Sequence, residues 1–419
     1  MLGVILLNIV ESLFSLARFE GVPFLLIRPK DISGPEIYSG DFDLLIKPES
    51  LDCFLLCVME VCSKNSFNFC IRRRKKEKIN LNIYLGSGEE FIDFDLWTEL
   101  DVKDSGFPRG TFISWSDLES SGLIINDSGR FFLDNNFSAM YYMSHLYSKR
   151  KNINDHSVKR RIDYYRNLDG LSSFSHSLLW NVNNKSMQKA NREMSSLGLF
   201  SHSRMYRLKK LFYRSIKKLE ARSNMVAVIG PDGVGKTTII NRFCMCRDAE
   251  SFRFKRLFRR RVLYKVVFSF NLKKEEKKYG QPLEKNQFDD LNNLTLFWIS
   301  LIPGYLLSFF SRVGKMKVLD RYYIDLLMSG VRFEDKDVKV NNSSGTLINI
   351  APSTKCIIQL DAPSDIIIKR KKELSHFTID VLRREYFKLV LKKKPPLYYY
   401  INTNNSIEST FEFVDNLGF

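Results

Sequence analysis

Residues 226–238 read VAVIGPDGVGKTT, an apolar run that leads into a glycine-rich turn and two threonines. Gly230 to Thr237 match the pattern G-x-x-x-x-G-K-[ST], in which a strand is followed by a loop and a helix. The glycines let backbone N–H groups converge on phosphates, and the N-terminus of the helix adds its positive end. The stretch therefore predicts a phosphate-binding loop within an α/β domain.

The motif also predicts what its side chains do. Lys236 would reach the β- and γ-phosphates of a nucleotide, and the hydroxyl of Thr237 would bind Mg²⁺. ATP and Mg²⁺ are therefore the predicted cofactors. The residues predicted to bind them in the loop are Gly230, Asp232, Gly233, Gly235, Lys236, Thr237 and Thr238.

A second motif, MKVLDRYYIDLL at residues 316–327, reads as a short strand ending in Asp320, which would bind or orient the magnesium shell. ATPases that drive motion or transport usually carry Glu next, to orient the attacking water. Here Arg321 follows the aspartate. Its guanidinium does not give up its proton, so it cannot replace the glutamate that orients the water. Its planar fork suits a phosphate-bearing acceptor. No Asn-Lys-x-Asp run for guanine is present. The pattern thus favours transfer of a phosphoryl group.

Residues from about 205 to 419 resemble the thymidylate kinase-like branch of the nucleoside-monophosphate kinases. The resemblance is carried by GPDGVGKTT, VLDRYY, IIQLDAPSDIIIKRKKEL and LRREYFKL, with INTNNSIE near the end, all in the order of that family. It implies an ATP- and Mg²⁺-dependent kinase that transfers the γ-phosphate to a nucleoside monophosphate or a similar phosphorylated acceptor. A kinase acting on a sugar or a surface-glycan intermediate is the alternative.

The resemblance further implies roles for side chains outside the loop's backbone. Asp232 would contact the sugar of the acceptor or its metal shell, and Arg321 would bind the acceptor phosphate. A basic lid that excludes water would lie at residues 370–372. The side chains assigned to catalysis, to the lid and to the donor phosphates are Lys236, Arg321, Arg370, Lys371, Lys372 and Arg383, with Tyr386 on the same helix as Arg383. In place of the Arg-x-Pro region of thymidylate kinases stands SFRFKRLFRRRVLYKVV.

Two acidic pairs mark the front half, in SGDFDLLI and EFIDFDLW. Because side chains alternate along a strand, Asp41 and Asp43 share one face and Asp93 and Asp95 share another. Two such strands resemble the minimal nucleotidyltransferase fold, although its Gly-Ser is missing. We expect Asp41, Asp43 and Asp93 to bind a divalent metal. The alternatives are a degenerate binding module, Asp residues that face water, and a nucleotidyltransferase whose ATP-binding domain is regulatory.

Length and patterning predict several domains, since the chain has 419 residues, 44% of them hydrophobic. We expect an α/β fold class. Residues 204–419 would form a P-loop three-layer domain with a parallel sheet, preceded by a smaller α+β nucleotidyltransferase-like domain at 1–105. Residues 106–203 would form a helical extension and connector.

The formal net charge of +18 suits polyanionic ligands. No fold signature for nucleic-acid binding accompanies the basic segment at 252–265, so nucleic acid is not an expected partner. The expected partners are a nucleotide and a small phosphorylated acceptor, and a homodimer is an open alternative. Seven scattered cysteines without a repeated Cys-x-x-Cys favour a reducing cytoplasm.

Three apolar or amphipathic segments raise the question of a membrane. The first residues and the basic segment 203–224 are predicted as amphipathic helices, and LTLFWISLIPGYLLSFF at 294–310 as a buried core helix. Peripheral membrane contact is an alternative that we do not favour.

Overall fold

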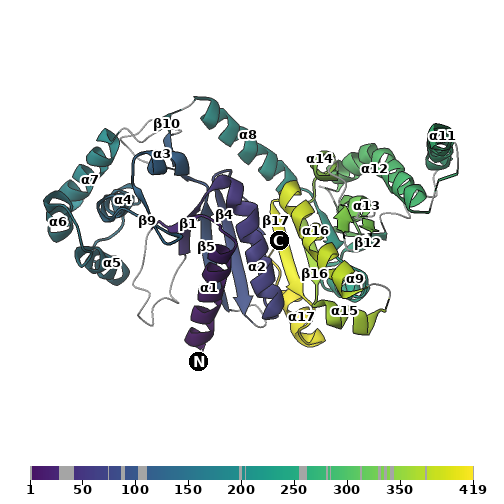
Figure 1. The fold of residues 1–419 in the computed structure, drawn as a ribbon, viewed down its shortest axis with the longest axis horizontal. Coiled ribbons are helices and arrows are strands. Elements are labelled where there is room, and N and C mark those ends of the chain that lie inside the picture. Colours follow the sequence, from purple (N-terminus) through teal and green to yellow (C-terminus); the bar gives the residue numbers. More distant parts are fainter. Residues whose placement is uncertain are drawn as a thin grey trace. The chain divides into compact units, whose positions relative to one another are not determined.

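The computed structural model describes most of the chain. The described residues are 2–27, 42–73, 75–85, 90–101, 111–197, 201–202, 204–253, 262–279, 282–283, 285–311, 314–328, 332–334, 337–339, 344–372 and 375–418. Figure 1 shows the ribbon coloured by residue number. Contacts between residues divide the chain into two units, each made of several segments. The N-terminal unit comprises Met1–Val58, Lys75–Leu81 and Ile92–Arg214, and the C-terminal unit comprises Met59–Arg74, Asn82–Phe91 and Ser215–Phe419. The domain limits at residues 105 and 203 stay predictions.

The C-terminal unit is built on a sheet whose strands lie in the order β3-β17-β16-β11-β13-β12. These strands are β3 (Asn68–Arg72), β11 (Met225–Ile229), β12 (Glu250–Arg253), β13 (Lys317–Asp320), β16 (Cys356–Asp361) and β17 (Leu397–Asn402). All neighbours from β17 to β12 are parallel, whereas β3 pairs with β17 in the antiparallel sense. The predicted α/β class with a parallel sheet is confirmed, and β3 is an addition that the sequence did not predict.

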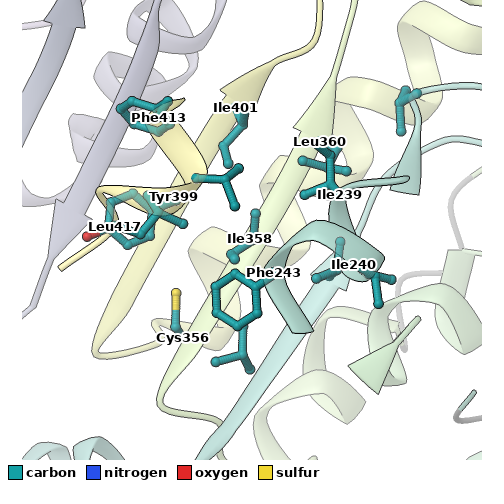
Figure 2. Packing of buried hydrophobic residues seen from close by; sticks show 14 of the residues in the cluster. Ile239, Ile240, Phe243, Cys356, Ile358, Leu360, Tyr399, Ile401, Phe413 and Leu417 are labelled. Atoms are coloured by element: carbon teal, nitrogen blue, oxygen red, sulfur yellow. The ribbon is translucent and has the colours of Figure 1, made fainter. Parts of the chain in front are cut away.

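Helices cover both faces of this sheet, because buried side chains alternate between the faces along each strand. On one face, Ile358 and Tyr399 pack with Phe243 of α9 (Lys236–Arg247) and Phe413 of α17 (Ile407–Asp415), as Figure 2 shows. On the other face, Phe387 of α16 (His376–Lys393) packs on Phe69 and Tyr398 at centroid distances of 5.8 and 5.5 Å. The unit is therefore a three-layer α/β/α domain.

The C-terminal unit has further helices and two short strands, and Figure 1 labels the helices α11 to α15. They are α11 (Val262–Tyr279), α12 (Lys285–Phe310), α13 (Tyr323–Leu327), β14 (Arg332–Glu334), β15 (Asp337–Lys339), α14 (Ser344–Ile350) and α15 (Ser364–Arg370). Helix α12 corrects a prediction, since only 33% of its apolar window Gln287–Phe310 is buried. It is a helix with one buried and one exposed apolar face, not a buried core helix.

The N-terminal unit contains strands in the order β1-β2-β5-β4 and helices with their own cores. Its first elements are α1 (Leu2–Phe19), β1 (Phe24–Leu26), β2 (Phe42–Ile46), β6 (Glu99–Asp101), β7 (Thr111–Ser114), α3 (Trp115–Ser120), β8 (Ile124–Asp127) and β9 (Arg130–Leu133). The others are α4 (Asn135–Ser148), α5 (His156–Arg166), α6 (Ser173–Trp180), α7 (Asn184–Ser196) and β10 (Ser201–His202). The division between the units falls within α2 (Leu51–Lys64), β4 (Lys78–Leu85), β5 (Glu90–Trp97) and α8 (Arg204–Ala221).

Candidate phosphate-binding site

The loop between β11 and α9 needs glycine at three positions. Gly230 has φ +138°, and a Cβ there would lie 2.2 Å from the carbonyl oxygen of Leu360 on the neighbouring strand β16. Gly233 and Gly235 also have positive φ, +95° and +87°, and Gly235 is the N-cap of α9. Since other residues rarely adopt these angles, the glycines let the chain turn sharply from the sheet edge into the helix.

Cationic side chains from three separate elements converge on Asp232 in this loop. The Nζ of Lys236, in the first turn of α9, lies 3.0 Å from Asp232 Oδ1. Arg321, directly after β13, donates from Nη2 to both carboxylate oxygens at 2.9 and 3.1 Å. Lys371, directly after α15, has its Nζ 3.6 Å from Oδ2. The structure thus brings Lys371, which was predicted to belong to a lid, close to the residues of the loop.

The ammonium group of Lys236 is held in place by the loop itself. Its Nζ donates to the carbonyl oxygens of Gly230 and Pro231, both at 2.7 Å. The side chain is 8% exposed, so its charge lies in a largely desolvated position. A cation fixed in this way interacts with an anion more strongly than one on a solvated surface.

Arg321 is positioned by its own backbone, and its guanidinium interacts electrostatically with the buried carboxylate of Asp325. Its φ of +72° lies in the left-handed region, which is uncommon for residues other than glycine and is found often at functional sites. Its backbone N–H donates to Val228 O at 3.1 Å, which ties the turn to β11. Asp325 accepts from Tyr322 N and Tyr386 Oη, each at 2.8 Å. Burial raises the pKa of Asp325, and the charges of Lys236 and Arg321 oppose that rise.

Asp325 is a site residue that the sequence reasoning missed. It stands three residues after Tyr322, the N-cap of α13, and its carboxylate accepts from Tyr322 N at 2.8 Å. An acidic residue in the first turn is one of the sequence signals for a helix start. The carboxylate of Asp325 also interacts electrostatically with Arg321.

Polar residues end the neighbouring parallel strands at the edge where the loop lies. Asp320 ends β13, and its Oδ2 is 3.6 Å from Nε of Arg253, which ends β12. Thr237 and Thr238 are exposed at the start of α9. A carboxylate and a hydroxyl fit the needs of Mg²⁺, which is usually bound by one or two carboxylates, substrate phosphates and water. Ligands of open α/β sheets bind at this edge.

Arg370 and Arg383, both predicted to act on phosphates, are engaged elsewhere in the unit. Arg370 donates to Thr403 Oγ1 at 3.1 Å and to the carbonyl oxygen of Thr403 at 2.8 Å. Arg383 forms a two-point ion pair with Asp361, from Nε at 2.6 Å and from Nη2 at 2.8 Å. Their phosphate-binding roles stay predictions, and these contacts favour structural roles.

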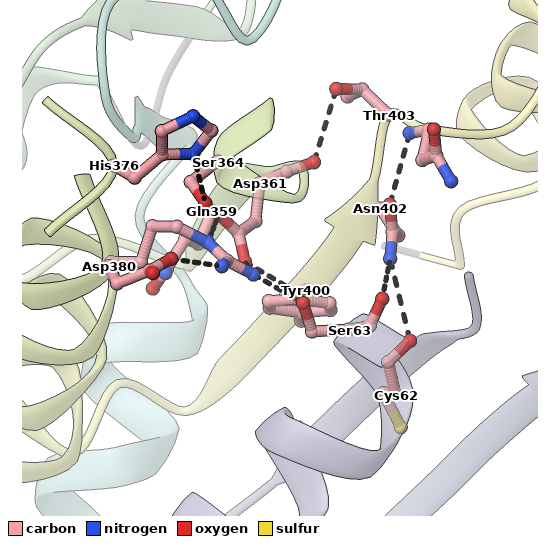
Figure 3. Close-up of polar contacts among 12 residues, drawn as sticks. Cys62, Ser63, Gln359, Asp361, Ser364, His376, Asp380, Tyr400, Asn402 and Thr403 are labelled. Carbon is pink, nitrogen blue, oxygen red and sulfur yellow. Dashed lines mark hydrogen bonds and ion pairs between the residues drawn. The ribbon is translucent and has the colours of Figure 1, made fainter. Parts of the chain in front are cut away.

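Asp361 is the centre of a polar cluster at the end of β16 that the sequence did not reveal. Figure 3 shows its carboxylate next to Tyr400, whose hydroxyl donates to Oδ2 at 2.6 Å. Its backbone carbonyl accepts from Thr403 N at 2.7 Å. The carboxylate is fully buried, and the guanidinium of Arg383 is its counter-ion. Ser63, near the end of α2, also accepts from Arg383.

Comparison with known proteins gives a limited result. The sequence matches no protein-family model, and no curated protein matches it. Among solved structures, deoxyadenosine kinase from M. mycoides with the products dCMP and a flexible dCDP is similar at TM-score 0.32 and 13% identity, covering 46% of this chain and 97% of that one. The structure of the same kinase with bound dCTP has a TM-score of 0.27 and 14% sequence identity, and the structure with bound dATP has a TM-score of 0.27 and 13% identity. Both cover the same shares of the two chains. Similarity at this level does not identify a function, which has to follow from the geometry of the site itself.

The acidic residues of the N-terminal unit are engaged by neighbouring side chains. Asp43 and Asp95 are register partners on the parallel strands β2 and β5, and both are buried. Trp97 Nε1 donates to Asp43 Oδ1 at 3.2 Å, while Lys78 and Asn80 donate to Asp95. The alternative that these two Asp residues face water is wrong, because they are 4% and 6% exposed.

The metal site predicted at Asp41, Asp43 and Asp93 stays a prediction. Asp41 lies outside the described residues, while Asp93 is on β5. Among the residues that the structure describes, no group of three or more His, Cys, Asp or Glu side chains is arranged to hold a metal ion. The ammonium group of Lys78 lies against Asp95, and it supplies positive charge there without a metal.

The geometry around Asp232 leads to a testable pKa. Burial would raise the pKa of this carboxyl, but the charges of Lys236, Arg321 and Lys371 outweigh burial and lower the pKa from 3.8 to about 2. The pKa of Asp232 is lower in the folded protein than in the unfolded chain. The ionised carboxylate therefore stabilises the folded state above about pH 4, and this contribution is lost as the pH falls toward 2. Carboxyl-detected NMR titration of Asp232 measures this. In Lys236→Met the Asp232 pKa should rise toward 3.8, and an unchanged value would contradict the assigned cause.

Proposed function

We propose that this protein is an ATP- and Mg²⁺-dependent kinase that transfers the γ-phosphate to a nucleoside monophosphate or a similar phosphorylated acceptor. The observation that supports this most is the convergence of Lys236, Arg321 and Lys371 on one carboxylate. The three cations come from the loop, from the end of β13 and from the end of α15. Such a cluster suits a transferring phosphoryl group, whose charge is spread over its equatorial oxygens.

The proposed roles follow from the contacts of each residue. Lys236, fixed by two loop carbonyls, would neutralise the charge that develops between the β- and γ-phosphates. Thr237 and Asp320 would hold Mg²⁺, which supplies further neutralisation when bound. Arg321 would bind the acceptor phosphate, since its Nη2 already donates to both oxygens of a carboxylate.

In this proposal, Asp232 occupies the place of an anion until substrate arrives. A phosphate that enters would compete with the carboxylate for Arg321 and Lys371, and Asp232 would then turn to a hydroxyl of the acceptor. Lys371 would move with the end of α15 and cover the phosphates as a lid. We place the protein in the cytoplasm, with a nucleotide and a small acceptor as its ligands.

Transfer of label from γ-labelled ATP tests the proposal directly. The acceptor panel should contain nucleoside monophosphates, sugars and sugar phosphates. We expect labelled product with at least one phosphorylated acceptor, formed faster than ATP is hydrolysed without acceptor. Transfer only to an unphosphorylated sugar would favour a glycan kinase, and acceptor-independent hydrolysis alone would exclude the kinase proposal.

A further inference from the structure

Helix α12 carries a continuous apolar stripe on its exposed side. The residues of this stripe are Leu294, Trp298, Ile302, Tyr305, Leu306, Phe309 and Phe310, each between 41 and 73% exposed. Their spacing of three and four residues places them along one side of the helix. No charged residue occurs between positions 291 and 311. Contiguous apolar surface of this kind marks an interaction site.

The opposite side of α12 is fixed to the core of the C-terminal unit. Phe297 is fully buried and packs on Tyr323 of α13 with ring centroids 5.4 Å apart. Tyr323 donates to the carbonyl oxygen of Ser300 at 2.6 Å. At Gly304 a Cβ would lie 2.2 Å from the hydroxyl oxygen of Tyr323. The close packing leaves α12 no freedom to rotate, so its apolar stripe stays on the outside.

Among the described residues, α12 is the one helix long and apolar enough to cross a membrane by length and composition. A buried core helix and a signal sequence would have the same composition without any membrane. Here the window is only one-third buried and lies far from the first residue. Since its other side belongs to the core, this helix would lie along a membrane surface rather than cross it.

The stretch that precedes α12 in the sequence is strongly basic. Residues 252–279 contain eleven Lys and Arg against two Glu. Their second part, α11, packs on α12, with Phe268 and Phe288 at a centroid distance of 5.1 Å. Exposed lysines lie at positions 273, 274, 277 and 278 of α11. Lysines next to an apolar helix face are the composition of helices that bind anionic lipid.

We propose that the apolar stripe of α12 docks on the surface of an anionic lipid bilayer, with the lysines of α11 contacting lipid phosphates. Charge selects this occupant over a second copy of the chain. A dimer through α12 would bring two chains of net charge +18 together and place two basic α11 helices near each other. An anionic surface attracts the same charges and accepts the same apolar side chains.

Vesicle flotation and tryptophan fluorescence test the proposal on the full chain. We expect the protein to float with vesicles of phosphatidylcholine and phosphatidylglycerol, and the emission of Trp298, 51% exposed, to shift to the blue. Ile302→Glu should lower the partition coefficient about tenfold or more, because a side chain that enters the bilayer is replaced by a charge. Met245→Glu, on the exposed side of α9, is the matched control and should bind as the parent does.

Further variants distinguish lipid binding from self-association of the chain. Trp298→Phe should abolish the blue shift, whereas Trp180→Phe, at an exposed tryptophan of α6, should keep it. Raising the salt concentration should weaken binding. Equal binding by parent and Ile302→Glu, at equal melting temperatures, would overturn the proposal. A dimer in sedimentation equilibrium that Ile302→Glu dissociates, without flotation of the parent, would overturn it in favour of a second copy.

Discussion

Lys236→Ala is expected to lower the rate of the proposed phosphoryl transfer by roughly 10²- to 10³-fold, the loss seen when one preorganised donor is removed from a developing charge. The fold should survive, because the described contacts of this ammonium group all lie within the loop, to Gly230, Pro231 and Asp232. Labelled-ATP transfer measures the rate, and thermal unfolding checks the fold. Most of the loss should appear in kcat, since the charge to be stabilised is largest in the transition state.

A lysine of the same domain provides the control for this variant. Lys388→Ala removes a charge on α16 whose partner is Glu385, at 2.6 Å, and should leave the rate within about twofold of the parent. If Lys236→Ala consumed ATP at the parent rate with acceptor present, the loop would have no catalytic role and the kinase proposal would be wrong.

Arg383→Met is expected to lower the free energy of unfolding by about 3–5 kcal/mol, because it leaves the fully buried charge of Asp361 without its counter-ion. Arg383 is itself 11% exposed and makes two hydrogen bonds to that carboxylate. Denaturant unfolding measures the loss. The pair ties α16 to the end of β16, so destabilisation should also affect the edge of the sheet where nucleotide is proposed to bind.

The neighbouring arginine is a close control. Arg384 pairs with Glu60 at 3.2 Å but is 59% exposed, so Arg384→Met should cost less than about 1 kcal/mol. The double variant Arg383→Met with Asp361→Leu should recover much of the loss, because both charges are then absent. Equal losses in the two single variants would contradict the assignment of the effect to a buried charge.

Much of the fold of the C-terminal unit could be predicted from the sequence, because its strands are short apolar runs that end in turn residues. VAVI and IIQL alternate with helical segments, and such alternation predicts a parallel sheet. The antiparallel strand β3 could not be predicted as part of this sheet, because its residues NFCIR lie in the front half of the chain. No pattern in the neighbouring sequence indicates that they pair with β17. Helix α12 was misjudged because composition is the same for an apolar helix buried on all sides and for one buried on a single side.

The site could be predicted in part for a similar physical reason. The loop motif and the Asp-Arg pair predicted Lys236, Asp232 and Arg321 as site residues, and the structure brings these residues together. Whether an arginine faces a ligand or a buried carboxylate depends on the three-dimensional neighbourhood. Arg370 and Lys371 are adjacent in sequence, yet one binds Thr403 and the other approaches Asp232. Their sequence context gives no way to tell them apart.

The pairing of β3 with β17 has a consequence for the order in which the chain can fold. Asn68 and Asn402, hydrogen-bonded at this junction, are 334 residues apart. At translation rates of roughly 5–20 residues per second, Asn68 is made about 20–70 s before its partner exists. During that interval β3 has no β17 to pair with, and the end of α2 lacks Asn402, which donates to Ser63 O. The pairing of β3 with β17 therefore forms only when synthesis is almost complete, so the last strand made supplies the hydrogen-bond partner of a strand made early.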